Sequence, residues 1–97
     1  MDWLTFPARL IAWRGPAPFV FAPVADDLVD TVRAEARIAS YGWGCVPVEA
    51  RIGDTPFTTS LIPREGGYLL PVKVAVQRAE DISVGDDVLV QMRVLLR

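Results

Sequence analysis

The chain has 97 residues, no histidine and one cysteine, Cys45. Without histidine, Ser-His-Asp and Cys-His catalysis and a histidine general base are excluded. A lone cysteine cannot form an internal disulfide, and without histidine it cannot complete a structural zinc site. The acidic doublets Asp26-Asp27 and Asp86-Asp87 lack the ligand spacing of a magnesium or calcium site. We therefore expect no metal and no cofactor.

Basic residues are also few. Lys73 is the only lysine, the formal net charge is −2 and the sequence pI is about 4.9. Proteins that bind nucleic acid usually carry a basic stripe, because neutralising phosphates supplies most of their affinity. The balance of charge therefore argues against nucleic acid, although the arginines could still gather on one face.

Export signals and long apolar runs are missing as well. The opening MDWLTFPARL carries Asp2 where a signal peptide needs positive charge, and it lacks a continuous apolar core. No apolar run approaches the length of about 20 residues that crosses a membrane. A single cysteine suits a reducing compartment. We expect a cytoplasmic protein with no membrane span.

The residues that are present predict strands. The chain is 52% hydrophobic, which favours one self-sufficient domain over residues 1–97. Apolar residues alternate with polar ones at the start of the chain and again after Gly44, the pattern of half-buried strands. Between these regions Leu28, Val32 and Ala36 recur at helical spacing. We predict one helix near 25–39.

Two hairpins follow the helix. A turn at Gly53-Asp54 would pair Ile52 with Thr55, so that apolar residues face apolar residues. A four-residue loop around Arg64-Glu65 would then pair Leu61 with Tyr68, Thr59 with Leu70 and Phe57 with Val72. The strand that contains Tyr68, Leu70 and Val72 is expected to continue, with Val74 and Val76 also pointing into the barrel.

A last strand over DVLVQMRVLL completes the pattern. About six strands and one helix are too much sheet for an open layer in so short a chain. We predict a mainly β fold, a small antiparallel barrel, closed or double-split, capped by the helix.

Candidate binding residues lie near strand ends or on the outward face of the predicted sheet. They are Trp43, Arg51, Ser60, Arg64, Tyr68 and Lys73. In the predicted register Arg51 and Lys73 flank Pro56 on neighbouring strands, which would give a shallow anion-binding surface or an ordinary solvated face. Ser60 has no general base beside it, so we predict no catalytic residue.

Three leucines point outward in the predicted register, namely Leu69, Leu89 and Leu95. Contiguous exposed apolar patches usually mark interfaces. Either the helix covers these side chains or a second copy of the chain does, which makes a homodimer one hypothesis.

The segment from Tyr41 to Val94 contains GWG.VPV, IG.T.F.TSL.P, GGYLLPVK and I..GD.V.V, and a weaker F.A.L..W.GPAPF.F precedes it. These motifs closely resemble the bacterial domain-of-unknown-function (DUF) family nineteen-zero-five. The resemblance implies a small double-split β-barrel, fused in some members to a YdeI/OmpD-associated (bacteriocin-protection) domain. It brings no established reaction, cofactor or ligand. Gln77 stands where members tend to have a basic residue, with Arg78 after it.

Three functions follow as hypotheses. The first is a non-enzymatic barrel that binds a partner or small ligand at the end carrying Trp43, Ser60, Arg64, Tyr68 and Lys73. The second is a DNA-binding dimer, because ISVGDDVLV is similar to turns in swapped-hairpin transition-state regulators. The third is an enzyme with a carboxylate or lysine centre.

Overall fold

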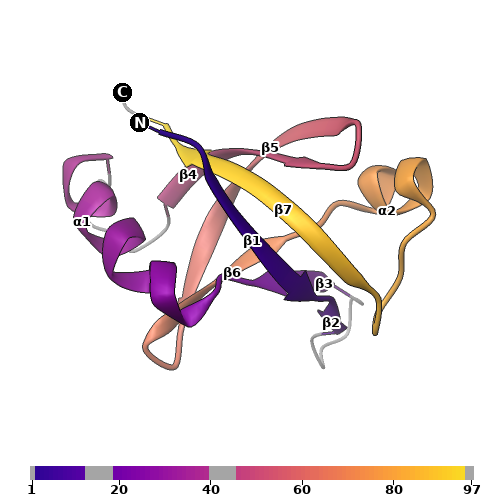
Figure 1. Ribbon diagram of the computed structural model, residues 1–97, viewed down its shortest axis with the longest axis horizontal. Coiled ribbons are helices and arrows are strands. Elements are labelled where there is room, and N and C mark those ends of the chain that lie inside the picture. Colours follow the sequence, from indigo (N-terminus) through magenta and orange to yellow (C-terminus); the bar gives the residue numbers. More distant parts are fainter. Residues whose placement is uncertain (1, 13–18, 40–45, 96–97) are drawn as a thin grey trace.

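A computed structural model describes residues 2–12, 19–39 and 46–95. Within these residues, seven antiparallel strands form a nearly closed barrel with two α-helices (Figure 1). The strands are β1 (Leu4–Arg9), β2 (Ile11–Ala12), β3 (Val20–Pro23), β4 (Val46–Ile52), β5 (Thr55–Arg64), β6 (Gly67–Pro71) and β7 (Asp87–Val94). A short 3-10 turn, η1 (Asp26–Leu28), leads into α1 (Val29–Ala39), and α2 (Val74–Glu80) follows β6. None of the described helices is long and apolar enough to cross a membrane.

The barrel closes through its first two strands. The strand order is β1-β7-β4-β5-β6-β3-β2, so its two ends are consecutive in the chain. Leu10 lies between them, and its backbone N–H donates to the Asp86 carbonyl at 2.9 Å while its carbonyl accepts from the Gly85 N–H at 2.9 Å. β1 and β2 therefore act as one strand that pairs first with β7 and then with β3. Counted this way, the predicted barrel of about six strands is confirmed.

The core follows from strand alternation. One connected cluster of buried apolar side chains fills the barrel, and among the described residues no polar side chain is buried. Its largest fully buried members are Phe6, Leu10, Leu61, Leu70 and Met92. Each such side chain contributes about 1.5–3 kcal/mol through burial. The inward and outward faces predicted for β1, β4 and β7 are those observed.

The β4–β5 hairpin has the predicted register, with Ile52 opposite Thr55 and a turn at Gly53-Asp54. Gly53 has φ +58°, which suits a turn with glycine at its first central position.

The register of the β5–β6 hairpin differs from the prediction. Ile62 pairs with Leu69 and Arg64 with Gly67, so the turn is the two residues Glu65-Gly66. Their φ values of +50° and +79° are those of a type I′ turn, whose twist matches the flanking strands. The predicted pairing of Leu61 with Tyr68 was wrong by two positions. Because two is the side-chain period of a strand, the inward face is unchanged.

The segment after β6 is helical, which corrects the predicted strand. Val76 is buried, but Val74 is 55% exposed, so the alternation expected to carry both inward does not exist. The helix ends in a Schellman motif: Asp81 has φ +54°, and the Ile82 N–H donates to the Gln77 carbonyl at 3.0 Å. The Gln77 side-chain amide donates to the Val72 carbonyl at 2.9 Å, closing the bend between β6 and α2.

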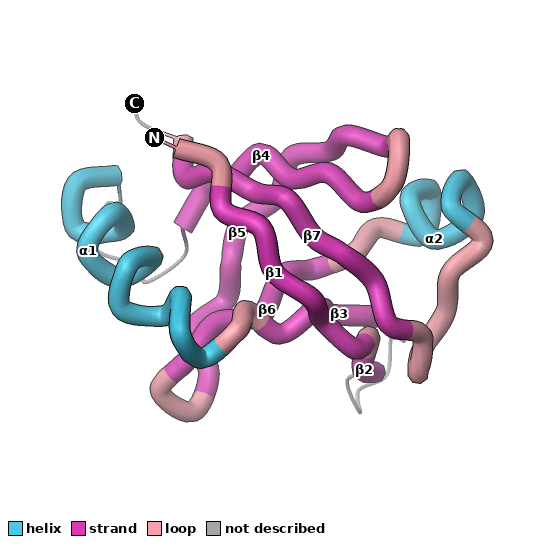
Figure 2. Tube along the Cα trace, viewed as in Figure 1, coloured by secondary structure: helices cyan, strands magenta, loops and turns pink. Residues whose placement is uncertain are grey.

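The predicted helix near 25–39 is confirmed as η1 and α1. Val32 and Ala36 are buried and Leu28 is half-buried, as the helical stripe requires. α1 and α2 lie at opposite ends of the barrel, and the N- and C-terminal strands run side by side (Figure 2).

Candidate functional site

A cavity of about 380 Å³ opens beside the tip of the β5–β6 hairpin. We call it the polar pocket. It lies between this tip, the start of η1 and β2, and its lining includes Asp26, Arg64, Glu65, Tyr68 and Leu69. The hairpin and the η1 turn are distant in the sequence, and the pairing of β3 with β6 brings them together.

An apolar groove of about 260 Å³ adjoins the polar pocket. It is lined by Phe19, Phe21, Ile62, Pro63, Arg64 and Leu69. Phe19 is 57% and Ile62 40% exposed, whereas Leu69, beside Ile62 on the neighbouring strand, is 7% exposed. Because Arg64 and Leu69 line both spaces, the pocket and the groove are neighbours on the surface.

Leu69 corrects one prediction. Its outward direction was expected to expose it or to require α1 or a second chain as cover, yet it is buried by its own neighbours on the outer face of the barrel. In the true register Leu69 stands opposite Ile62 and Pro23. Of the other two leucines, Leu89 is 60% exposed, as predicted, and Leu95 is half-buried.

The hairpin tip is held by backbone and charged contacts. The Val24 N–H donates to the Tyr68 carbonyl at 3.0 Å, which extends the pairing of β3 with β6 towards η1. From α1, the Arg33 guanidinium donates to the Gly66 carbonyl at 3.1 Å and to the Asp30 carboxylate at 3.1 Å. These contacts fix the tip while the side chains of Arg64 and Tyr68 remain along the pocket wall.

The polar pocket contains opposite charges. Arg64 Nε lies 4.0 Å from Glu65 Oε1, an ion pair at the surface. Asp26 makes no side-chain hydrogen bond or ion pair with the described part of the chain, and the Tyr68 hydroxyl is likewise without a partner there. The pocket therefore offers a carboxylate that accepts hydrogen bonds and a phenol that donates or accepts them.

The candidate residues from the sequence divide among three places. Arg64 and Tyr68 lie together in the polar pocket. Lys73 lies beyond the other end of β6, five residues from Tyr68 along extended chain, roughly 17 Å at the rise of a strand. Arg51 and Ser60 are exposed on the outer wall, on β4 and β5, and Trp43 is outside the described residues.

The anion-binding surface predicted between Arg51 and Lys73 required Lys73 to lie on a strand paired with β5, and this pairing does not form. Arg51 pairs with Pro56 as expected. Lys73, however, is the extended residue before α2 and belongs to no strand, so it does not stand opposite Pro56.

Asp26, Phe19, Phe21 and Ile62 line the site but were absent from the predicted set. Asp26 is also the first residue of η1. A signal for the groove was present: a two-residue turn at Glu65-Gly66 sets Ile62 opposite Leu69, which places two outward apolar residues side by side.

Metal-ligating groups do not gather in this site. No cluster of three or more histidine, cysteine, aspartate or glutamate side chains suited to a metal ion occurs among the residues that the structure describes.

Comparison with protein families agrees with the motifs quoted above. The model of a domain of unknown function, DUF1905, matches residues 6–92. The chain belongs to the DUF1905 family. The matched range begins at Phe6 in β1, ends at Met92 in β7 and includes the other strands and both helices in full. No match was found among curated proteins.

Proposed function

We propose that this DUF1905 chain is a non-enzymatic binding domain, with a small-molecule site formed by the polar pocket and the apolar groove. The observation that carries the proposal is that the two spaces adjoin and share Arg64 and Leu69 in their linings. Small-molecule sites are typically concave, mostly apolar, and supplied with a few polar groups that fix orientation. Cavities of about 380 and 260 Å³ are on the scale of such sites.

The chemistry of the lining defines the ligand class. An apolar group of the ligand lies against Phe19, Ile62 and Leu69 in the groove. A cationic or N–H group reaches the Asp26 carboxylate, and Tyr68 supplies a further hydrogen bond. The ligand is therefore amphipathic, with an aromatic or aliphatic body and a basic end.

Binding is favoured over catalysis by what these groups can do near neutral pH. Asp26 and Tyr68 are suited to orienting a ligand, and the chain has no histidine to act as a general base beside them. The exposed hydroxyl of Ser60 lies on β5 opposite Pro47, outside the lining of the pocket and groove.

A titration followed by ¹⁵N NMR tests the proposal with phenethylamine as the probe and phenylacetate as its anionic counterpart. We expect amide shifts from phenethylamine confined to residues 19–26 and 62–69. Asp26→Asn should weaken binding about tenfold or more, because a charged hydrogen bond is worth about 1.5–3 kcal/mol, and Tyr68→Phe should weaken it severalfold. Ser60→Ala is the matched control and should change nothing.

Two outcomes would contradict the site. One is a set of shifted amides elsewhere in the barrel. The other is equal binding of the amine by the native chain and by Asp26→Asn.

A further inference from the structure

The outer face of β1, β7 and β4 carries a second arrangement of polar and aromatic side chains, on a different wall from the polar pocket. Glu49 on β4 pairs with Arg93 on β7. Arg93 Nη2 lies 2.7 Å from Glu49 Oε1, and its Nε donates to the same oxygen at 2.9 Å. The Arg93 guanidinium also stacks on Trp3, with Cζ 4.9 Å from the ring centroid.

This stack fixes Trp3 in place. The interaction of Arg93 with the ring is a cation–π contact, and the ion pair to Glu49 orients the guanidinium. The Trp3 ring is nevertheless 46% exposed. A large aromatic surface is thus oriented at the outside of the barrel, where it can receive a second planar group.

Arg51 lies one position along β4 on the same face, between Gln91 on β7 and Pro56 on β5. It is exposed and forms no ion pair or hydrogen bond with the residues that the structure describes. Pro56 has no side-chain acceptor, and Gln91 carries no charge. Within the described part of the chain Arg51 thus has no ion-pair partner, in contrast to Arg93, which is paired with Glu49.

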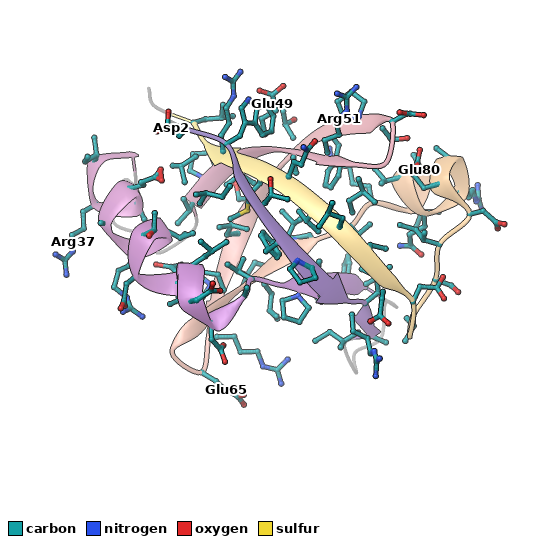
Figure 3. All side chains as sticks on the ribbon, in the orientation of Figure 1. Asp2, Arg37, Glu49, Arg51, Glu65 and Glu80 are labelled. Carbon is teal, nitrogen blue, oxygen red and sulfur yellow. The ribbon has the colours of Figure 1, made fainter. Side chains whose placement is uncertain are left out.

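A hollow of about 480 Å³ separates these groups and is lined by Trp3, Glu49, Arg51, Pro56 and Gln91. Figure 3 shows Glu49 and Arg51 along one side of the molecule and Glu65, from the polar pocket, on the opposite side. Leu4 stands opposite Met92, so the preceding residue, Trp3, lies two strands across from Arg51 and two residues further along, roughly 12 Å away. A ligand with one aromatic ring and an acidic substituent spans this separation when the Trp3 and Arg51 side chains lean towards each other.

We propose that this hollow, the Trp3–Arg51 site, binds a small planar aromatic anion. The ring of the ligand lies against Trp3, and its carboxylate or phosphate pairs with Arg51, whose planar fork matches both groups. The Gln91 amide and the remaining acceptor capacity of Glu49 provide hydrogen bonds to polar substituents of the ring. The site shares no residue with the pocket and groove of the proposed function.

NMR on the full chain tests this proposal, with the Trp3 indole N–H as the reporter, assigned by its loss in Trp3→Phe. Benzoate and adenosine monophosphate are the probes, and benzamide and adenosine are their neutral counterparts. We expect saturable shifts of the Trp3 indole and of the Arg51 and Gln91 amides at millimolar concentrations of an anionic probe. Comparison of the two anions shows whether carboxylate or phosphate is preferred.

Arg51→Ala should weaken binding about tenfold or more, since a charge-assisted pair is worth about 1.5–3 kcal/mol, and Arg51→Lys should retain part of it. Arg37→Ala, an exposed arginine on α1, is the matched control and should bind as the native chain does. The proposal is wrong if neutral and anionic probes bind equally, if Arg51→Ala binds normally, or if the Trp3 signal does not move. Asp26→Asn should leave the shifts of the Trp3, Arg51 and Gln91 signals unchanged, so the two proposed sites are tested independently.

Discussion

The two hairpin turns that flank β5 have the same length but different surroundings. One is Gly53-Asp54 between β4 and β5, and the other is Glu65-Gly66 between β5 and β6. β5 is 10 residues long and holds the turns at opposite ends of the barrel, roughly 30 Å apart (Figure 1). Each turn is contacted by a helix, α2 at the first and α1 at the second.

The contacts differ in what they cover. At the first turn the Thr55 hydroxyl donates to Glu80 Oε2 at 2.6 Å, and the Glu80 carboxylate occupies the space that a Cβ on Gly53 would need. At the second turn, a Cβ on Gly66 would have nothing within 4 Å, and Arg33 of α1 donates to the Gly66 carbonyl. The first turn is a structural attachment for α2. The second leaves its side chains available to the polar pocket.

Gly53→Ala should give the largest effect. Alanine at φ +58° costs about 1–2 kcal/mol in the backbone, and displacing Glu80 removes a charged hydrogen bond worth about 1.5–3 kcal/mol. We expect the free energy of unfolding to fall by about 2.5–5 kcal/mol in urea denaturation. Gly66→Ala, with positive φ and open space, should show the backbone cost alone.

A double-mutant cycle isolates the role of the carboxylate. In a Glu80→Ala chain, Gly53→Ala should cost no more than Gly66→Ala does in the native chain. Equal costs for the two glycine substitutions in the native chain would show that Glu80 is no obstacle and that the turns are equivalent.

Glu65→Asn should have a smaller and opposite effect. Glu65 has φ +50°, a conformation that asparagine adopts more readily, and Asn-Gly is the preferred pair for a type I′ turn. We expect stability to rise by about 0.5 kcal/mol, read as a higher urea midpoint. Glu65→Gln removes the same negative charge but does not make positive φ more favourable at this position. An equal gain in stability from Glu65→Gln would therefore show that the loss of charge causes the effect.

The smallest effect concerns a pair away from both turns. Arg9 on β1 donates to Asp87 on β7 at 3.0 and 3.3 Å, and this hydrogen bonding, followed by the charge of Arg9, lowers the pKa of Asp87. A carboxyl with a lowered folded pKa stabilises the fold above its unfolded pKa of about 3.9 and loses that contribution as the pH falls through the folded value. The two side chains are 71% and 72% exposed, so the gain is small.

Asp87→Asn should therefore be slightly less stable than the native chain near neutral pH, and the difference should vanish in acid, when Asp87 of the folded native chain is protonated. Thermal denaturation across this pH range measures it, with Asp27→Asn as the control on η1. A difference that persists or grows in acid would show that the pair does not act through the charge of Asp87.

Local patterns explain the parts of the fold that were predicted correctly. Period-two alternation assigned the inward faces of β1, β4 and β7, and the glycine-containing turn after Ile52 set the β4–β5 register. Helical spacing located α1, because it places Val32 and Ala36 on one apolar face of a helix. The acidic residues at the start of this segment suit the first turn of a helix.

The errors have a common cause. Val72, Val74 and Val76 alternate as a strand does, yet seven residues from Val74 form a helix. A short apolar run of this kind fits either structure, and packing decides between them. Here Val76 enters the core and Glu80 reaches the β4–β5 turn, two contacts that only the helix makes together.

Of the candidate site, only Arg64 and Tyr68 were grouped correctly, because they are neighbours across one hairpin. Sequence spacing could not show that Asp26 and Phe19 join them. Those residues arrive through the pairing of β3 with β6, a contact between segments more than forty residues apart.

The sequence by itself determined the chemistry available to this protein and the face on which most strand residues lie, because composition and side-chain parity are local properties. It also carried the motifs of the DUF1905 family. The tertiary structure alone decided which outward side chains came to line one space: Leu69 with Phe19 in the apolar groove, Asp26 with Tyr68 in the polar pocket, and Trp3 with Arg51 in the hollow on the opposite wall. Those neighbours depend on strand order and on the closure of β1 and β2 onto β7 and β3, which are set by packing across the whole barrel.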